Sequence, residues 1–158
     1  MNNIKVFEND LPDDLDLSNE KFIGLDNEAL GLVLGRDPLT LVQLGLESKN
    51  FYLVKVNRET FKAPNLVKVL SNSNIQFIMH YARQDLLWLK YHLKVQPKNI
   101  FCTKVASKIA RTASSFHGYK DLVKELCGKD ISKKEQQSDW GNPNLSEKEI
   151  KYAASDTE

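Results

Sequence analysis

The segment from Phe22 to Glu28 is a run of mostly apolar residues that ends in two acids, and it constrains the fold more than any other stretch of the chain. Its length and composition predict a short buried strand. Residues i and i+2 of a strand share a face, so Asp26 and Glu28 point the same way at the strand end. Paired carboxylates favour hard divalent cations such as Mg²⁺ or Mn²⁺. The segment therefore predicts either a metal platform or a solvated strand end.

The apolar pattern of the rest of the chain predicts a layered α/β domain. Strands are predicted at residues 22–28, 39–46, 51–56, 75–79 and 100–103. Helices are predicted at 65–70, from Arg83 onward, at 104–111, around 122–127 and after Ser146, where Ser146 and Glu149 form a capping box. The first three strands are joined by short turns, which indicates an antiparallel meander. We therefore expect a mixed sheet of five strands flanked by helices.

Size and composition limit the classes of function. A chain of 158 residues suits one domain, and a net charge of +1 argues against binding long nucleic acid by bulk electrostatics. No apolar run has the length needed to cross a bilayer, and the segment from Met1 to Lys5 lacks the pattern of a secretory signal. We therefore expect a cytoplasmic protein that does not engage a membrane.

The charges are distributed unevenly along the chain. Residues 8–20 contain six acids and no Lys or Arg, whereas residues 104–134 contain eight basic residues and three acids. A basic segment that faces a carboxylate cluster would let a metal-dependent site admit a phosphate backbone. The alternative is that these lysines form only the solvated faces of helices.

Two further signals accompany the acids of the first predicted strand. Asp85 lies at the start of a predicted helix, and Tyr152 and Asp156 lie one turn apart on one face of the last predicted helix. Together with Asp26 and Glu28, this ordered set resembles the DEDD superfamily of 3′-5′ exonucleases, in the subgroup whose third motif contains tyrosine.

The closer resemblance is to the ribonuclease D group. The stretch 80–86 (HYARQDL) resembles the second motif of that group, and residues 138–140 (SDW) with 152–156 (YAASD) resemble its third-motif region. Over essentially its whole length the chain also resembles the nano-RNase C group, compact bacterial members that cleave very short oligoribonucleotides. The resemblance implies a ribonuclease H-like exonuclease fold, with residues 1–158 as a single exonuclease domain.

The resemblance also implies a mechanism. Two divalent cations, Mg²⁺ or Mn²⁺, would lie at the scissile phosphate, and their charge would balance the four carboxylates of Asp26, Glu28, Asp85 and Asp156. Tyr152 would orient the attacking water, a role that suits a phenol that stays neutral near neutral pH. Hydrolysis would release nucleoside 5′-monophosphates from the 3′ end of short single-stranded RNA, down to dinucleotides.

Further residues are candidates for contact with the substrate. By analogy with the family, Leu30 either inserts between the last two bases or is an ordinary core leucine. His80 either contacts the terminal sugar or is a buried structural histidine. The candidates for binding a 5′ phosphate of a dinucleotide follow an apolar segment in the basic half of the chain, and they are Ser107, Lys108, Arg111 and His117.

The chain departs from the family pattern in two places. Asn27 replaces the hydroxyl residue that usually separates the first two acids, and we expect it to face away from the metals and to affect packing only. Family members continue beyond the third-motif aspartate with helices that help to build a ring-shaped oligomer, whereas this sequence ends at Glu158. We therefore expect a domain without those helices and a homo-oligomer in the intact protein.

Two other functions remain open at this point. The first keeps the chemistry and changes the substrate to structured RNA 3′ ends, as in ribonuclease D. The second is a non-catalytic RNA-binding or assembly module that uses the fold without the third motif. The position of Asp156 separates the second from an enzyme, because catalysis requires its carboxylate to reach the other three acids.

Overall fold

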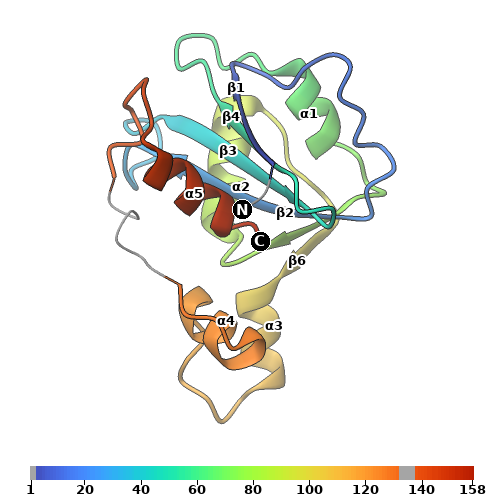
Figure 1. Ribbon diagram of the computed structural model, residues 1–158, viewed down its shortest axis with the longest axis vertical. Helices are drawn as coiled ribbons and strands as arrows, with labels where there is room; N and C mark the ends of the chain where they lie inside the picture. Colours follow the sequence, from blue (N-terminus) through green and yellow to red (C-terminus); the bar gives the residue numbers. More distant parts are fainter. Residues whose placement is uncertain (1–2, 132–137) are drawn as a thin grey trace.

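The computed structural model describes residues 3–131 and 138–158, which form a sheet with helices on both faces (Figure 1). The strands are β1 (Ile4–Glu8), β2 (Phe22–Ala29), β3 (Leu39–Leu46), β4 (Phe51–Lys55), β5 (Gln76–Met79) and β6 (Ile100–Cys102). The helices are α1 (Pro64–Leu70), α2 (Arg83–Trp88), the π-helix η1 (Leu89–Leu93), α3 (Thr103–Ala110), α4 (Tyr119–Cys127) and α5 (Glu147–Ser155). The strand order in the sheet is β1-β4-β3-β2-β5-β6.

Within the described residues the sheet has six strands, so the predicted number of five is wrong. The additional strand, β1, pairs in parallel with β4 at the edge of the sheet. Only Ile4 and Phe7 of β1 are partly buried, so this edge strand lacks the apolar pattern of the inner strands. The predicted meander is confirmed, because β2 pairs antiparallel with β3 and β3 with β4. The parallel strands β5 and β6 extend the sheet beyond β2 and make it mixed.

The two faces of the sheet are covered by different helices. On one face, Val42 and Leu44 of β3 belong to the main core, which includes side chains from α1, α2 and η1. On the other face, Leu41 of β3 belongs to a second core cluster, together with Trp140 and with Ala153 of α5. Burial on both faces explains why residues 39–46 form an almost continuous apolar run.

Helix α5 is held at both of its ends. At its start the predicted capping box is present: the Ser146 Oγ accepts from the Glu149 backbone N–H at 3.3 Å, and the Ser146 backbone N–H donates to Glu149 Oε2 at 2.7 Å. At its end, Thr157 lies on a pair of glycines, Gly24 and Gly45, that are opposite each other on β2 and β3. A Cβ atom added to either glycine would lie 2.3 Å from the Thr157 carbonyl oxygen. The last residues therefore rest directly on the sheet, which fixes the position of Asp156.

Helices α3 and α4 form a pair beside the β6 edge of the sheet (Figure 1). The hydroxyl of Tyr119, at the start of α4, donates to the backbone carbonyl of Ser155 of α5 at 3.0 Å. Strand β6 runs directly into α3. Helix α4 ends at Gly128, whose φ of 67° is left-handed, as predicted for a glycine after a helix. In the described residues, no helix has the length and apolar character needed to cross a membrane.

Candidate active site

Four acids from three elements lie around one cavity. Asp26 and Glu28 are on β2, and Asp156 follows the last turn of α5. One carboxylate oxygen from each of these three residues lies within 4.8 Å of the others. Asp85, in the first turn of α2, lines the same cavity, which has a volume of about 330 Å³. The residues that the sequence singled out as metal ligands are therefore close together in space.

Burial and mutual repulsion raise the pKa values of these carboxyl groups. Burial, followed by the charges of Asp85, Glu28 and Asp156, raises the pKa of Asp26 well above its ordinary value. Burial and the charges of Asp156 and Asp85 raise the pKa of Glu28 to about 8. Burial raises the pKa of Asp85 to about 7. In the absence of a cation, ionising all of these carboxyl groups in the cavity would therefore cost free energy.

The donor set fits a hard divalent cation. All of the clustered ligand atoms are carboxylate oxygens, which Mg²⁺ and Mn²⁺ prefer. Within residues 3–131 and 138–158, no Lys or Arg forms an ion pair with Asp26, Glu28 or Asp85. A divalent cation would therefore supply the positive charge that these side chains lack.

Tyr152 places a neutral phenol beside the acids. It is on α5, one turn before Asp156, and it lines the cavity. Burial, the charge of Asp156 and a hydrogen bond to that residue raise the pKa of Tyr152 above its ordinary value. The Trp140 ring, whose centroid is 6.1 Å from the Tyr152 ring, packs beside it. The phenol therefore stays protonated and fixed near neutral pH, as a hydrogen-bond donor must.

Asn27 connects the strand that carries two of the acids to the helix that carries another. Its Nδ2 donates to the backbone carbonyl of Asp85 at 3.2 Å. This contact ties β2 to the first turn of α2, so Asn27 contributes packing and orientation between Asp26 and Asp85.

His80 and Leu30 differ in their environments. His80 is half-buried, its Nδ1 is 2.9 Å from Thr103 Oγ1, and its ring is 5.6 Å from the Tyr119 ring. It also lines the cavity, so a fixed histidine faces the site.

Leu30 is 43% exposed, so it is not a residue of the core, which was one of its two predicted roles. It lies beside Gly141, where an added Cβ would approach Leu30 Cδ2 to 2.7 Å.

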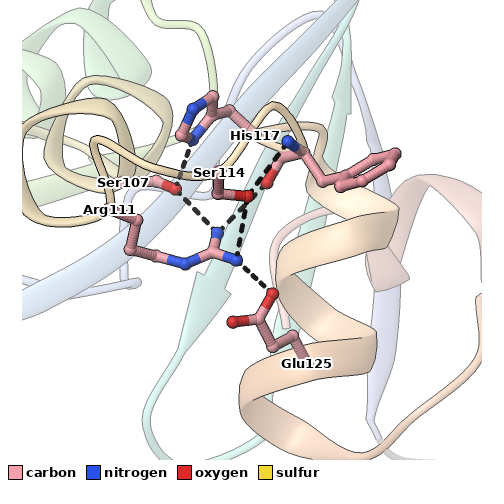
Figure 2. A network of polar contacts seen from close by, with 6 residues as sticks. Ser107, Arg111, Ser114, His117 and Glu125 are labelled. Atoms are coloured by element: carbon pink, nitrogen blue, oxygen red, sulfur yellow. Dashed lines mark hydrogen bonds and ion pairs between the residues drawn. The ribbon is translucent and has the colours of Figure 1, made fainter.

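Three of the four candidates for a 5′ phosphate form a polar network with Glu125 (Figure 2). Ser107 Oγ lies 2.8 Å from His117 Nδ1, and Arg111 Nη1 donates to Ser107 Oγ at 3.0 Å. Arg111 also forms an ion pair with Glu125 of α4. Lys108, the fourth candidate, is exposed and contributes no hydrogen bond to this network among the described residues.

The network adjoins the acidic cavity without lining it. Lys104 precedes Ser107 by one turn of α3, and Gly118 follows His117 directly; both line the cavity. His117 is therefore one residue, and Ser107 one helical turn, away in the chain from a residue that lines the acidic cavity. Of the basic residues predicted at 104–134, Lys133 and Lys134 lie outside the described residues.

Sequence reasoning missed other residues that line the cavity. These are Tyr81, Gln84, Lys104, Gly118, Tyr119 and Ile131. Tyr81 lies inside the stretch that resembles the second motif, but nothing in its spacing marks it as a contact. Lys104 is one of many lysines in the basic segment, so charge alone could not separate it from those on the solvated helix faces.

Comparisons with known proteins identify the family of the chain. A 3′-5′ exonuclease family model matches residues 8–158. Ribonuclease D of Xanthomonas oryzae pv. oryzae is 31% identical over 147 residues, which are 93% of this chain and 40% of that protein. The chain thus spans less than half the length of this curated relative.

Solved structures of NrnC are also similar. Brucella melitensis NrnC bound to pGG is 39% identical, with a TM-score of 0.92 over 99% of this chain and 76% of that chain. The same protein with bound Mg²⁺ is 38% identical, with a TM-score of 0.90 over 98% of this chain and 75% of that chain. These matches confirm the predicted ribonuclease H-like exonuclease fold. The chain therefore belongs to the 3′-5′ exonuclease domain family of the DEDD superfamily, with ribonuclease D and NrnC among its relatives.

Proposed function

We propose that this chain is a metal-dependent 3′-5′ exoribonuclease that hydrolyses short single-stranded oligoribonucleotides, down to dinucleotides, to nucleoside 5′-monophosphates. The observation that supports this most is the convergence of Asp26, Glu28, Asp85 and Asp156 around one cavity. Oxygen ligands of this number and type are those that two-metal phosphodiesterases need.

The four carboxylates would hold two divalent cations, Mg²⁺ or Mn²⁺. Cations at this position supply two things to hydrolysis, namely activation of the attacking water and stabilisation of negative charge on the leaving 3′ oxygen. The Mg²⁺ named in an NrnC structure supports the choice of a divalent cation. Three of the ligands, Asp26, Glu28 and Asp156, would bind the cations with carboxylate oxygens that lie within 4.8 Å of one another. Asp85 would supply the fourth carboxylate from the first turn of α2.

Tyr152 would orient the attacking water. Its phenol lines the cavity and hydrogen-bonds to Asp156, and its raised pKa keeps the proton in place near neutral pH. A neutral donor holds water by a hydrogen bond without adding negative charge to a site that already contains four acids.

The rest of the substrate would meet residues around the cavity. Leu30, exposed and one residue beyond β2, would insert between the last two bases, and His80 would contact the terminal sugar. The network of Ser107, Arg111 and His117, with Lys108 nearby on α3, would bind a terminal 5′ phosphate. A guanidinium with an adjacent hydroxyl is a suitable donor set for a phosphate. The pGG in an NrnC structure supports a short substrate.

The intact protein is proposed to be a cytoplasmic homo-oligomer, as the family resemblance implies. Size-exclusion chromatography with light scattering on the full-length protein tests the oligomer. A monomer at micromolar concentration would refute that part of the proposal.

A second candidate function is trimming of structured RNA 3′ ends. The similarity to ribonuclease D of Xanthomonas oryzae favours it. The non-catalytic alternative has less support, because a carboxylate oxygen of Asp156 lies within 4.8 Å of oxygens of Asp26 and Glu28.

Turnover of substrates of different length tests the proposal. A 5′-labelled diribonucleotide and a labelled twenty-nucleotide RNA are compared with Mn²⁺, with Mg²⁺ and with a chelator. We expect the dinucleotide to be cleaved faster, only with metal, and to yield mononucleotides. Faster cleavage of the longer RNA would support trimming instead, and full cleavage in chelator would refute both metal-dependent functions.

A further inference from the structure

The rim of the acidic cavity contains a tyrosine and a lysine that the proposed chemistry does not use. Tyr81 lies between β5 and α2, and Lys104 is in the first turn of α3. Both line the cavity together with the four acids. The Lys104 Nζ lies 4.2 Å from the centroid of the Tyr81 ring, which is within the range of a cation–π contact.

The backbone of Tyr81 is held in a conformation that bulky residues avoid. Its φ is 60°, and among the described residues that line the cavity it is the only one with a positive φ. Strained backbone of this kind persists where the surrounding structure enforces it, often at ligand sites. Tyr81 is also 52% exposed, so its ring is not part of the core. This backbone conformation therefore places an exposed aromatic ring at the edge of the cavity.

Lys104 brings a positive charge to the cavity of the proposed chemistry. Among the described residues that line the cavity, it is the only Lys or Arg. Where the structure describes the chain, Lys104 forms no ion pair with a carboxylate. The ammonium group is instead placed over the Tyr81 ring, which leaves its hydrogen-bond donors available.

With cations on the four acids, this cavity would attract an anion. Two divalent cations would cancel the charge of the carboxylates, and Lys104 would then add one positive charge. An aromatic ring next to an ammonium group is the combination that single-stranded nucleic acids use, because bases stack on the ring and phosphates contact the cation.

We propose that Tyr81 and Lys104 form a nucleotide subsite, in which the Tyr81 ring stacks on a base next to the scissile phosphate and Lys104 contacts the adjoining phosphate. This inference rests on the proposed function and names how that site holds its substrate. The subsite tolerates any base, because every base offers a face for stacking. The tyrosine hydroxyl makes no contribution to it.

Binding of a fluorescent dinucleotide tests the subsite without hydrolysis. The probe is a diribonucleotide that contains 2-aminopurine, and Ca²⁺ replaces Mg²⁺ or Mn²⁺. We expect Tyr81→Leu to raise the Kd on the order of tenfold and to remove the quenching of the probe. We expect Tyr81→Phe, which keeps the ring, to bind within about twofold of the unchanged protein. Lys104→Gln should raise the Kd by about threefold at low salt and make the Kd less dependent on salt, because one screened charge contact with a phosphate is lost.

A second tyrosine and lysine pair provides a matched control. Lys94 Nζ lies 5.1 Å from the Tyr91 ring centroid, Tyr91 is 45% exposed, and neither residue lines the acidic cavity. Tyr91→Leu and Lys94→Gln should leave the Kd and the salt slope unchanged.

The outcomes separate this inference from the proposed function. A Kd of Tyr81→Leu equal to that of Tyr91→Leu, or an unchanged salt slope in Lys104→Gln, would overturn the subsite. Cleavage of an RNA dinucleotide by the unchanged protein with Mn²⁺ tests the function independently. In that assay Tyr81→Leu should raise KM on the order of tenfold with little change in kcat.

Discussion

At the scale of single residues, the site depends on small side chains as much as on the acids. Gly24 and Gly45 are paired across β2 and β3 and leave room for the Thr157 carbonyl oxygen. Thr157 is 7% exposed and directly follows Asp156. The position of the last acid is therefore set by the absence of two Cβ atoms.

Gly45→Ala tests this dependence. The new Cβ would lie 2.3 Å from the Thr157 oxygen, so residues 156 and 157 must move away from the sheet. We expect kcat/KM on a dinucleotide to fall by at least about tenfold, and the free energy of unfolding to fall by about 1–3 kcal/mol. Kinetics and chemical denaturation measure the two effects.

Gly128→Ala is the control for Gly45→Ala. Gly128 has a left-handed φ of 67° and open space around its Cα, so alanine there strains the backbone without touching the site. It should lower stability by about 1 kcal/mol and leave kcat/KM unchanged. Equal losses of activity in the two variants would show that Gly45 acts through stability alone.

The sequence predicts the acids better than it predicts this glycine pair. Asp26 and Glu28 could be placed on one face because side chains alternate along a strand. The function of Gly45 could not be predicted, because it depends on the register between β2 and β3 and on where the chain passes after α5. Neither is a local property of the sequence.

At the scale of elements, the inner strands and the helices follow from local patterns, and the exceptions have physical reasons. The bounds of β3 agree with the predicted range 39–46 because both of its faces are buried. β1 was missed because three of its five residues are exposed. The π-helical turn at Leu89–Leu93 continues the apolar spacing of α2, so its hydrogen-bond pattern could not be distinguished from that of an α-helix.

The pair of helices α3 and α4 carries the network proposed to bind a 5′ phosphate (Figure 2). In this network the Glu125 carboxylate occupies a place on Arg111 that a phosphate would take. Glu125 is about half exposed, so the ion pair is weak and can be displaced.

Glu125→Gln should therefore improve binding of 5′-phosphorylated substrates. We expect the KM for a dinucleotide with a 5′ phosphate to fall by about threefold, and the KM for one without it to stay the same. Asp121→Asn, which changes an exposed acid on the same helix, is the control. An equal fall of KM for both substrates would indicate a general electrostatic effect. An unchanged KM for both substrates would show that the 5′ phosphate does not bind at Arg111.

At the scale of the whole molecule, the fold assembles acids that repel one another, so stability and metal binding are linked. The pKa of Glu28 is raised from 4.5 to about 8 and that of Asp85 from 3.8 to about 7. Without metal, these groups stay protonated in the folded chain at pH values where the unfolded chain has ionised them. The folded chain then binds more protons, so the free energy of unfolding falls as pH rises between about 4 and 8.

Thermal unfolding in chelator should show this fall. We expect the Tm to drop by at least about 5 °C between pH 5 and pH 8.5, and Mn²⁺ to restore most of the loss at pH 8.5. Glu28→Gln should have a smaller drop, because the amide has no charge to bury. A Tm in chelator that is constant or rises over this range would show that these carboxylates do not destabilise the metal-free fold.

Hydrolysis by this chain is proposed to depend on divalent cations that the four acids bind. The most direct measurement is the rate of mononucleotide release from a labelled dinucleotide as Mn²⁺ is titrated, for the unchanged protein, Asp85→Asn and the exposed control Glu147→Gln. We predict saturable dependence on Mn²⁺, a rate at least about a hundredfold lower in Asp85→Asn, and no change in Glu147→Gln. Release that persists without metal, or that Asp85→Asn leaves unchanged, would show that these acids do not bind the cations needed for hydrolysis.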